Sequence, residues 1–325
     1  MAEMSFLVAA RIFIAVFSLT DFFLTCTVNL LPSRQLCQFA VHCPRNTGYY
    51  TDYELLCGCN LKLAIADLHG RADLLEGLLE RVPSDTQFVF LGDAIDRGHR
   101  NRDTIRLLTK LADQGRMTLL RGNHEAIVLE VDECFDRFKR EPTELRRGDA
   151  LLAMQNWIQN GGDTVIVEYG GWDSGGEADA FGDWGLPPEL ISYAQRTEYT
   201  YRHAGGAAGD LLCVHAAPCQ VKGYRSLEDS LIWARPEDGP FALPDGVLLS
   251  VHGHTPVCAP TRIGQNIFMD LGAKWTGHLC TLDLDTMKFT TYKGLGEDTL
   301  ENLPAFEAVG GIEPVRLEFE VVELS

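Results

Sequence analysis

The segment Gly92-Asp-Ala-Ile-Asp-Arg-Gly98 brings two carboxylates and a guanidinium close together in the chain. Carboxylates bind metal ions and exchange protons, and a guanidinium binds phosphate or carboxylate oxygens through two parallel hydrogen bonds. The apolar run 87–91 before this segment has aromatic and branched members, which predicts a buried strand. Asp93 therefore follows the end of a strand, where an open α/β sheet usually holds its ligands.

Two other segments repeat this arrangement of an apolar run followed by polar residues. Residues 63–66 precede Asp67-Leu-His69-Gly70, and residues 117–120 precede Arg121-Gly-Asn-His-Glu125. After each polar segment the spacing of apolar residues predicts a helix, over 71–81, over 103–111 and from 126 onward. We therefore expect a β-α-β-α-β unit whose three polar loops share one edge of a parallel sheet.

Six polar residues that follow predicted strands offer oxygen or nitrogen donors and no thiolate: Asp67, His69, Asp93, Asn123, His215 and His254. This set suits Mn²⁺, Fe or Zn²⁺ better than Ca²⁺ or an iron–sulfur cluster. Six ligands exceed the needs of one structural zinc and suit two ions about 3.5 to 4 Å apart that share a carboxylate. The alternatives are helix N-caps for the two aspartates and a structural core histidine at His215.

In this order along the chain, the segments resemble the calcineurin-like metallophosphoesterases, and among them the phosphoprotein phosphatase branch. The resemblance covers residues 61–292 and implies an α/β fold of two packed mixed β-sheets flanked by helices (αββα). Pro256 replaces a second metal-binding histidine of other branches, which favours the phosphatase branch, and Ala66 departs from the usual glycine. The segments that carry the resemblance include Gly122-Asn-His-Glu125, Trp157-Ile-Gln-Asn-Gly-Gly162, His215, 231–235, Gly253-His-Thr-Pro256 and 269–273.

The resemblance implies a metal-binding role for each of the six donors. The first metal ion would be bound by Asp67, His69 and a bridging Asp93. The second ion would be bound by Asp93, Asn123, His215 and His254. A water or hydroxide between the ions would attack phosphorus in line.

The resemblance also implies how the leaving group and the phosphate are handled. His124 would be the general acid that protonates the leaving oxygen, and Asp96 would hold and charge its imidazole. The phosphoryl oxygens would be bound by Arg97, Arg121 and Arg235.

Hydrolysis of phosphoserine or phosphothreonine in proteins is the expected activity, with two divalent cations, of which Mn²⁺ is the first choice. The first alternative substrate is a phosphorylated small molecule, diadenosine tetraphosphate, cleaved symmetrically. A more remote alternative is a binding module that kept the fold without catalysis. A net charge of -18 argues against a nucleic-acid partner, because affinity for the phosphate backbone needs clustered Lys and Arg.

Residues 1–60 differ in composition from the remainder, since they contain five of the ten cysteines and few charged side chains. Residues 12–31 are apolar enough to suggest a membrane span, but an aspartate at the position of Asp21 costs about 2.5 to 3.5 kcal/mol there. Glu3 and the lack of an early basic cluster fit a signal peptide poorly. We expect a misassigned start near Leu61, or else a poorly ordered leader or anchor.

The remaining chain is expected to form a catalytic domain over 61–295 and an acidic C-terminal tail over 296–325. Residues 170–210 would form a loop or cap insertion, and a helix over 145–158 would stop at Asn160-Gly-Gly162. Residues 266–271, 278–284 and 288–292 would be antiparallel closing strands. The five cysteines after residue 60 show no metal-binding spacing, which favours free thiols in a reducing cytoplasm.

Overall fold

The structure is a computed structural model that describes residues 23–31, 34–42, 61–170 and 185–324. The chain divides into two units, Met1–Cys59 and Asn60–Ser325. In the first unit, strand β1 (Phe23–Leu31) pairs antiparallel with β2 (Arg34–His42). The rest of the expected leader lies outside the described residues, and so do residues 171–184 of the loop or cap insertion expected over 170–210. Within that insertion the structure has a helix, Pro188–Gln195, and a strand, Thr200–Gly206.

The second unit contains two six-stranded sheets, and both are mixed. In the first sheet, of order β14-β12-β11-β3-β4-β5, the strands β3, β4 and β5 are parallel and β11 runs antiparallel to β3. The parallel unit expected from the sequence is therefore confirmed. Its strands are β3 (Lys62–Ile65), β4 (Gln87–Phe90), β5 (Met117–Leu119), β11 (His278–Asp283), β12 (Phe289–Lys293) and β14 (Phe319–Glu323).

The second sheet has the order β13-β9-β10-β8-β7-β6. One expectation is corrected here, because β10 runs parallel to β8 and antiparallel only to β9. The chain forms β9 first and turns back at Gly264, so β10 returns in the direction of β8. The strands are β6 (Thr200–Gly206), β7 (Gly209–Val214), β8 (Leu249–His252), β9 (Thr261–Ile263), β10 (Asn266–Phe268) and β13 (Val315–Arg316).

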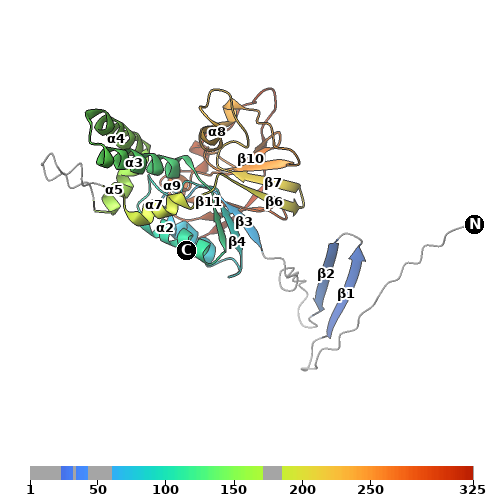
Figure 1. Cartoon of the computed structure of the whole chain (residues 1–325). Helices are drawn as coiled ribbons and strands as arrows, with labels where there is room; N and C mark the ends of the chain where they lie inside the picture. The colour runs from blue at the N-terminus through green and yellow to red at the C-terminus, as the bar shows by residue number, and fades with distance from the viewer. Residues whose placement is uncertain (1–22, 32–33, 43–60, 171–184, 325) are drawn as a thin grey trace, which may run out of the picture. The chain divides into compact units, whose positions relative to one another are not determined.

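Alternate side chains of the first sheet pack on its two opposite faces. Leu63 and Ile65 of β3 belong to the core under the helices, whereas Ala64 packs with Cys213 of the second sheet. Figure 1 shows α2, α3 and α7 on one side of β3, β4 and β11, with β6, β7 and β10 on the other. The expected αββα fold is thus confirmed.

The helices keep most of the boundaries that the apolar spacing predicts. The helix expected from residue 126 begins earlier, at Asn123, so two site residues belong to its first turn. The helices are α1 (Ala72–Leu79), α2 (Asn101–Asp113), α3 (Asn123–Arg140), α4 (Glu144–Trp157), α5 (Asp163–Glu168), α7 (Pro188–Gln195), α8 (Leu227–Trp233) and α9 (Ala273–Thr276). Short 3₁₀ turns span Pro236–Asp238 and Leu300–Asn302.

One further expectation is confirmed and another differs from the structure. The helix expected to stop at Asn160-Gly-Gly162 does so, because Gly161 takes a non-helical, positive φ of 102° and kinks the chain between α4 and α5. The acidic residues 296–325 are not a separate tail. They add β13 beside β9 and β14 beside β12, so each sheet gains an edge strand from them.

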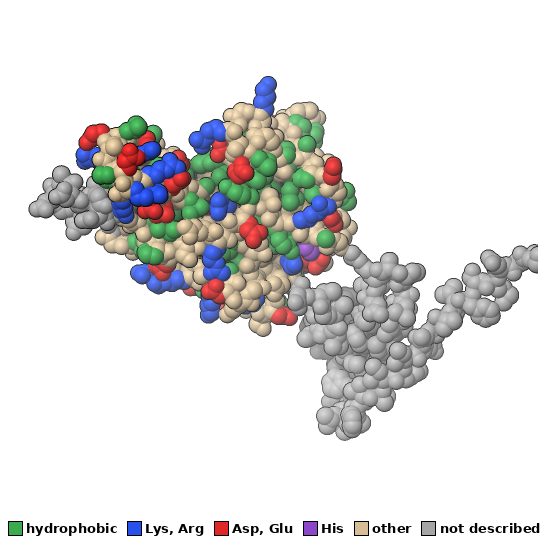
Figure 2. Space-filling model, in the orientation of Figure 1, with side chains coloured by type: hydrophobic (Ala, Val, Ile, Leu, Met, Phe, Trp, Pro, Cys, Tyr) green, Lys and Arg blue, Asp and Glu red, His purple; other side chains and the backbone are tan. Residues whose placement is uncertain are grey.

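The charge on the surface and the apolar character of the helices bear on what the protein could bind or insert into. Acidic and basic side chains are interspersed over the face that Figure 2 draws. Within the ranges that the structure describes, no helix combines the length and apolar character needed to cross a bilayer.

Thiol chemistry gives a first test of this fold. The five cysteines after residue 60 are all free, and Cys213 and Cys280 are fully buried. Burial raises the pKa of both thiols to about 12, so about one in 10⁴ is a thiolate at pH 8. We expect iodoacetamide to alkylate half-buried Cys258 in the native protein and to reach the two buried thiols only after unfolding. Peptide mass spectrometry checks this, and fast native labelling of Cys213 would contradict the packing of the two sheets.

Candidate active site

Three polar loops lie at one edge of the first sheet, as the sequence predicts. The parallel register places Ile65 beside Phe90 and Phe90 beside Leu119, so the three strands end together. The loops that follow carry Asp67 and His69 after β3, and Asp93 after β4. The side chains are therefore brought together by strand register rather than by closeness in sequence.

The second sheet supplies the remaining imidazoles. Strands β7 and β8 are parallel, with Cys213 beside Val251, and they too end at one edge. His215 directly follows β7 and His254 follows β8 by two residues. The rings of these two histidines lie 5.0 Å apart between centroids.

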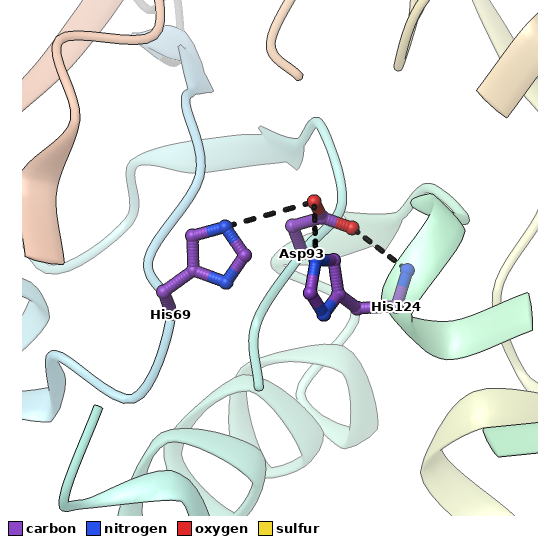
Figure 3. Close-up of side chains that lie close together, drawn as sticks. All are labelled: His69, Asp93 and His124. Carbon is purple, nitrogen blue, oxygen red and sulfur yellow. Dashed lines mark hydrogen bonds and ion pairs between the residues drawn. The ribbon is translucent and has the colours of Figure 1, made fainter. Parts of the chain in front are cut away.

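The carboxylate of Asp93 lies at the centre of this set. Its Oδ2 is 3.4 Å from Nε2 of His215 and 3.7 Å from Nε2 of both His69 and His124. Figure 3 shows the rings of His69 and His124, from the loop after β3 and the start of α3, both within reach of the Asp93 carboxylate. Asp93 Oδ1 also accepts the backbone N–H of His124 at 3.1 Å. One carboxylate thus faces imidazoles from both sheets.

The donors fit a pair of divalent cations. His69 and His215 each direct Nδ1 at a backbone carbonyl, of Ile95 and Leu91 respectively, at 2.8 Å. Metal-bound histidines nearly always make this contact, because it fixes the tautomer that leaves Nε2 free. His254 Nε2 is shielded from solvent and has no hydrogen-bond partner among the described residues.

The donor atoms also lie close enough to share ions. Those of His69, Asp93 and His124 lie within 4.8 Å of one another, and so do those of Asp93, His215 and His254. His215 Nε2 also faces Asn123 Oδ1 at 3.1 Å, so this nitrogen meets two oxygens and needs a proton or a cation between them.

Burial and neighbouring charges shift the pKa values in opposite directions. Burial by itself raises the pKa of Asp93, but the imidazoles of His215, His124 and His69 together hold it well below its usual range. Burial lowers the pKa of His215, but the carboxylates of Asp93 and Asp67 raise it to about 10. Burial, with His215 next, lowers the pKa of His254. The carboxylate of Asp93 is therefore anionic and the imidazole of His254 neutral, the forms that bind metal ions.

Asp67 lies beside the second sheet. Its carboxylate accepts the backbone N–H of His254 at 3.0 Å. A Cβ at Gly253 would lie 2.1 Å from Asp67 Oδ1, so only glycine permits this approach.

Burial, followed by the charge of Asp270, raises the pKa of Asp67. Asp270 also accepts from the backbone N–H of Gly272 at 2.8 Å, which braces the loop beneath the site. Ala66, the departure from the usual glycine, does not have a positive φ.

The two residues expected to act as a general-acid pair, His124 and Asp96, contact each other. His124 Nδ1 lies 2.6 Å from Asp96 Oδ2, and both side chains are buried. Burial raises the pKa of Asp96, although the hydrogen bonds from His124 and Trp157 oppose this. Trp157 has no role that its sequence surroundings predict, yet its Nε1–H donates to both carboxylate oxygens.

The three arginines expected to bind phosphate differ in their surroundings. Arg97 donates to Nε2 of both His69 and His124 at 2.9 Å, and its guanidinium also lies over the ring of Trp275. Because a guanidinium has only donors, both imidazoles must accept at Nε2. Arg235 is exposed, and its charge contributes to the lowered pKa of His254.

Arg121 does not match its expected role. Its guanidinium donates to Thr197 through Oγ1 and the carbonyl oxygen, and it also donates to Ala194 and Tyr199. It lies over the ring of Tyr199 as well, with 4.9 Å from Cζ to the centroid. These donors are committed to the chain after α7, so Arg121 fixes that segment to the end of β5.

Backbone strain is concentrated at the site. In the described part of the chain, six residues other than glycine have a positive φ. Five of them carry the expected chemistry, at φ values between 45° and 71°: His69, Asp93, Asp96, Arg97 and His254. Such conformations persist only where the surroundings fix them, and they cluster at functional sites.

Glu125 is a supporting residue whose role was not among the expectations from the sequence. Its buried carboxylate accepts the backbone N–H of Asp93, Ala94 and Gly122, each at 2.9 Å. Glutamate three residues after the residue that precedes a helix is a capping signal, which could have identified it.

Glu125→Gln should therefore lower the unfolding free energy by about 3 kcal/mol, because an amide NH₂ would face N–H donors. Urea unfolding of the metal-free protein measures this. The exposed variant Glu130→Gln, one turn further along α3, should be near neutral. Equal stability of the two variants would contradict the role of Glu125.

Comparison with known proteins places this site in a family. Residues 63–258 match the sequence profile of the calcineurin-like phosphoesterases, and this match spans more than half of the chain. The chain belongs to the calcineurin-like phosphoesterase family. The family, together with the two groups of side chains that could hold a metal ion, supports a metal-dependent phosphoesterase.

Matches to individual proteins are local. A segment of 67 residues is 48% identical to a protein phosphatase 2A catalytic subunit of Dictyostelium discoideum, covering 19% of this chain and 21% of that protein. A segment of 82 residues is 42% identical to the serine/threonine-protein phosphatase 6 catalytic subunit of Drosophila melanogaster, covering 22% and 27%. The matches span about a quarter of each relative's length. A solved putative diadenosine tetraphosphatase is similar with a TM-score of 0.46 and 16% identity, covering 74% of this chain and 96% of that chain.

Proposed function

We propose that this protein is a serine/threonine protein phosphatase that uses two divalent cations, with Mn²⁺ as the first candidate and Fe or Zn²⁺ as alternatives. The observation that carries the proposal is the Asp93 carboxylate facing three imidazoles, with the His124–Asp96 pair beside it. The local identity to catalytic subunits of protein phosphatases supports a phosphoprotein as the substrate.

Two overlapping sets of residues would hold the cations. One set is Asp67, His69 and Asp93. The other is Asp93, Asn123, His215 and His254. When bound, two such ions supply Lewis acidity, which lowers the pKa of water and offsets the charge on phosphoryl oxygens.

The chain's own residues would then handle the leaving group and the phosphate. His124 would protonate the leaving serine oxygen from Nε2, while Asp96 holds Nδ1. Arg97 donates to Nε2 of His69, the lone pair that a cation would use, so Arg97 would turn its donors toward phosphoryl oxygens once the site is loaded. Exposed Arg235 would be a second phosphate ligand. Arg121 has no place in this binding scheme, because its donors are met by the segment after α7.

Symmetrical cleavage of diadenosine tetraphosphate is the second candidate, since it needs the same metals and the same acid. Turnover of a phosphoserine peptide and of diadenosine tetraphosphate by the full chain with Mn²⁺, measured side by side, distinguishes the two. We expect faster release of phosphate from the peptide. Preference for the dinucleotide would replace the first candidate with the second, and turnover of neither would leave a binding module.

The net charge and the free thiols of the chain support a compartment and a kind of partner for the protein. The five free cysteines after residue 60 support a reducing compartment, and we place the protein in the cytoplasm on this ground. The net charge of -18 supports a phosphorylated protein rather than a nucleic acid as the partner.

A further inference from the structure

Trp157 is the last residue of α4, just before the kinked turn 158–162 at Gly161. Its side chain is buried, and its Nε1–H donates to Asp96 Oδ1 at 3.0 Å and to Asp96 Oδ2 at 3.2 Å. The same carboxylate faces His124 Nδ1 at 2.6 Å. A continuous set of hydrogen bonds therefore links the end of α4 to the imidazole that faces Asp93.

The kinked turn after Trp157 contacts Arg97 as well. The carbonyl oxygen of Gly161 accepts the backbone N–H of Arg97 at 2.9 Å. A Cβ at Gly161 would lie 2.6 Å from Arg97 Cγ, so this position must lack a side chain. Asp96 and Arg97 both have positive φ, so Trp157 and the turn after it contact two of the strained residues of the loop after β4.

Gly162 explains why the indole can reach Asp96. A Cβ at Gly162 would lie 2.5 Å from three atoms of the indole, including Nε1. The φ of this residue, -67°, is one that any amino acid adopts, so the requirement for glycine comes from the indole and not from the backbone. The lack of a side chain at Gly162 thus makes room for the indole of Trp157, and the lack of one at Gly161 makes room for Arg97.

We propose that Trp157 is a positioning residue for phosphoester cleavage, which holds the Asp96 carboxylate against Nδ1 of His124 so that Nε2 stays aimed at the leaving oxygen. If Trp157 only filled space in the core, a side chain of the same shape would suffice. The indole N–H instead donates to both oxygens of a buried carboxylate. The proposal rests on the proposed function, because it requires His124 to act as the general acid.

Leaving-group dependence separates positioning from packing. A basic leaving group such as phenolate needs a proton, whereas 2,4-dinitrophenolate leaves without one. We expect Trp157→Phe to lower kcat/KM about 10- to 100-fold for phenyl phosphate, the size of one hydrogen bond to a charged group. The loss for 2,4-dinitrophenyl phosphate should be about twofold. Equal losses on both esters would overturn the proposal.

Matched variants control for packing. Met154→Ala opens a cavity one turn earlier on the same buried face of α4 and should affect both esters equally. Gly162→Ala keeps the tryptophan but displaces its ring, and should reproduce the leaving-group pattern of Trp157→Phe. If Trp157→Phe does not fold, Gly162→Ala decides the question, and an equal effect of Gly162→Ala on the two esters would overturn the proposal.

A double-mutant cycle tests whether Trp157 acts through Asp96. In an Asp96→Asn background, Trp157→Phe should cost only about a further twofold with phenyl phosphate. If the rate losses of the two single variants multiply in the double variant, the two residues act independently and the proposal is overturned. A readout without turnover is the downfield proton resonance of the His124 Nδ1–H, which should be absent in His124→Asn and shifted in Trp157→Phe. An unshifted resonance would also overturn the proposal.

Failure of the two proposals can be told apart. If the unaltered protein hydrolyses neither ester, the proposed function fails. If His124→Asn shows the leaving-group dependence and Trp157→Phe does not, the role of His124 stands and that of Trp157 is overturned.

Discussion

Replacing Asp93 with asparagine should remove tight metal binding and lower phosphoester turnover by at least about 10³-fold, since a catalytic metal supplies several kcal/mol of charge stabilisation. Asp93 Oδ2 lies 3.4 to 3.7 Å from three imidazole nitrogens contributed by both sheets. An amide at this position loses the negative charge and can turn an NH₂ group toward those nitrogens. No other described carboxylate is placed to replace it between the two donor groups.

Metal content per chain, measured after dialysis against Mn²⁺ and buffer, checks this prediction alongside turnover. Asp85→Asn is a suitable control because Asp85 is an exposed aspartate in the loop before β4. It should keep both the metal content and the rate. An Asp93→Asn protein that retains two ions and normal turnover would show that Asp93 does not bridge the two ions.

Replacing His124 with asparagine should lower kcat by about 10²- to 10⁴-fold, the usual contribution of general acid catalysis, while both metal ions stay bound. His124 belongs to one of the two donor groups, so the geometry also allows it to be a metal ligand. Its short contact to Asp96 through Nδ1 favours the acid role, because a carboxylate at that nitrogen stabilises the charged imidazolium.

Metal content again separates the alternatives. Loss of one ion in His124→Asn would make His124 a ligand rather than the acid, and an unchanged rate would remove it from the mechanism. His99→Asn is the matched control, because His99 lies in the same loop as Asp96 but is exposed. This control should change neither the metal content nor kcat by more than about twofold.

The site residues could be predicted from sequence where local chemistry and strand order decide. Asp67 and Asp93 follow apolar runs directly, and parallel strands put such residues at one edge. His215, which the second sheet contributes, is a single histidine after a strand. Its local sequence does not assign it to the site, and only the order of the other motifs along the chain does. These predictions agree with the geometry because each depends on where a strand ends.

Long-range contacts explain what the sequence did not predict. Whether Arg121 faces phosphate or protein depends on Thr197, which is far away in sequence and reaches Arg121 through the end of α7. The direction of β10 depends on a hairpin with β9 rather than on its own composition. Phe319–Glu323 is short and acidic, and only its pairing with β12 makes it a strand.

The segment after α4 shows a third kind of limit. Asn160-Gly-Gly162 carries a helix-stop signal, and Gly161 takes the positive φ that this signal predicts. The two glycines also permit close approach, one to Arg97 and the other to Trp157. Spacing alone predicts the end of the helix but not these tertiary contacts. The contacts matter here because Trp157 donates to Asp96.

The most direct test of the central claim is a metal titration of the full chain after treatment with a chelator. Hydrolysis of a phosphoserine peptide and heat of binding are followed together as Mn²⁺ is added. A dinuclear site centred on Asp93 predicts no turnover without metal, saturation of binding at two ions per chain and maximal rate at the same point. Turnover that survives the chelator, or full activity at one bound ion, would contradict it.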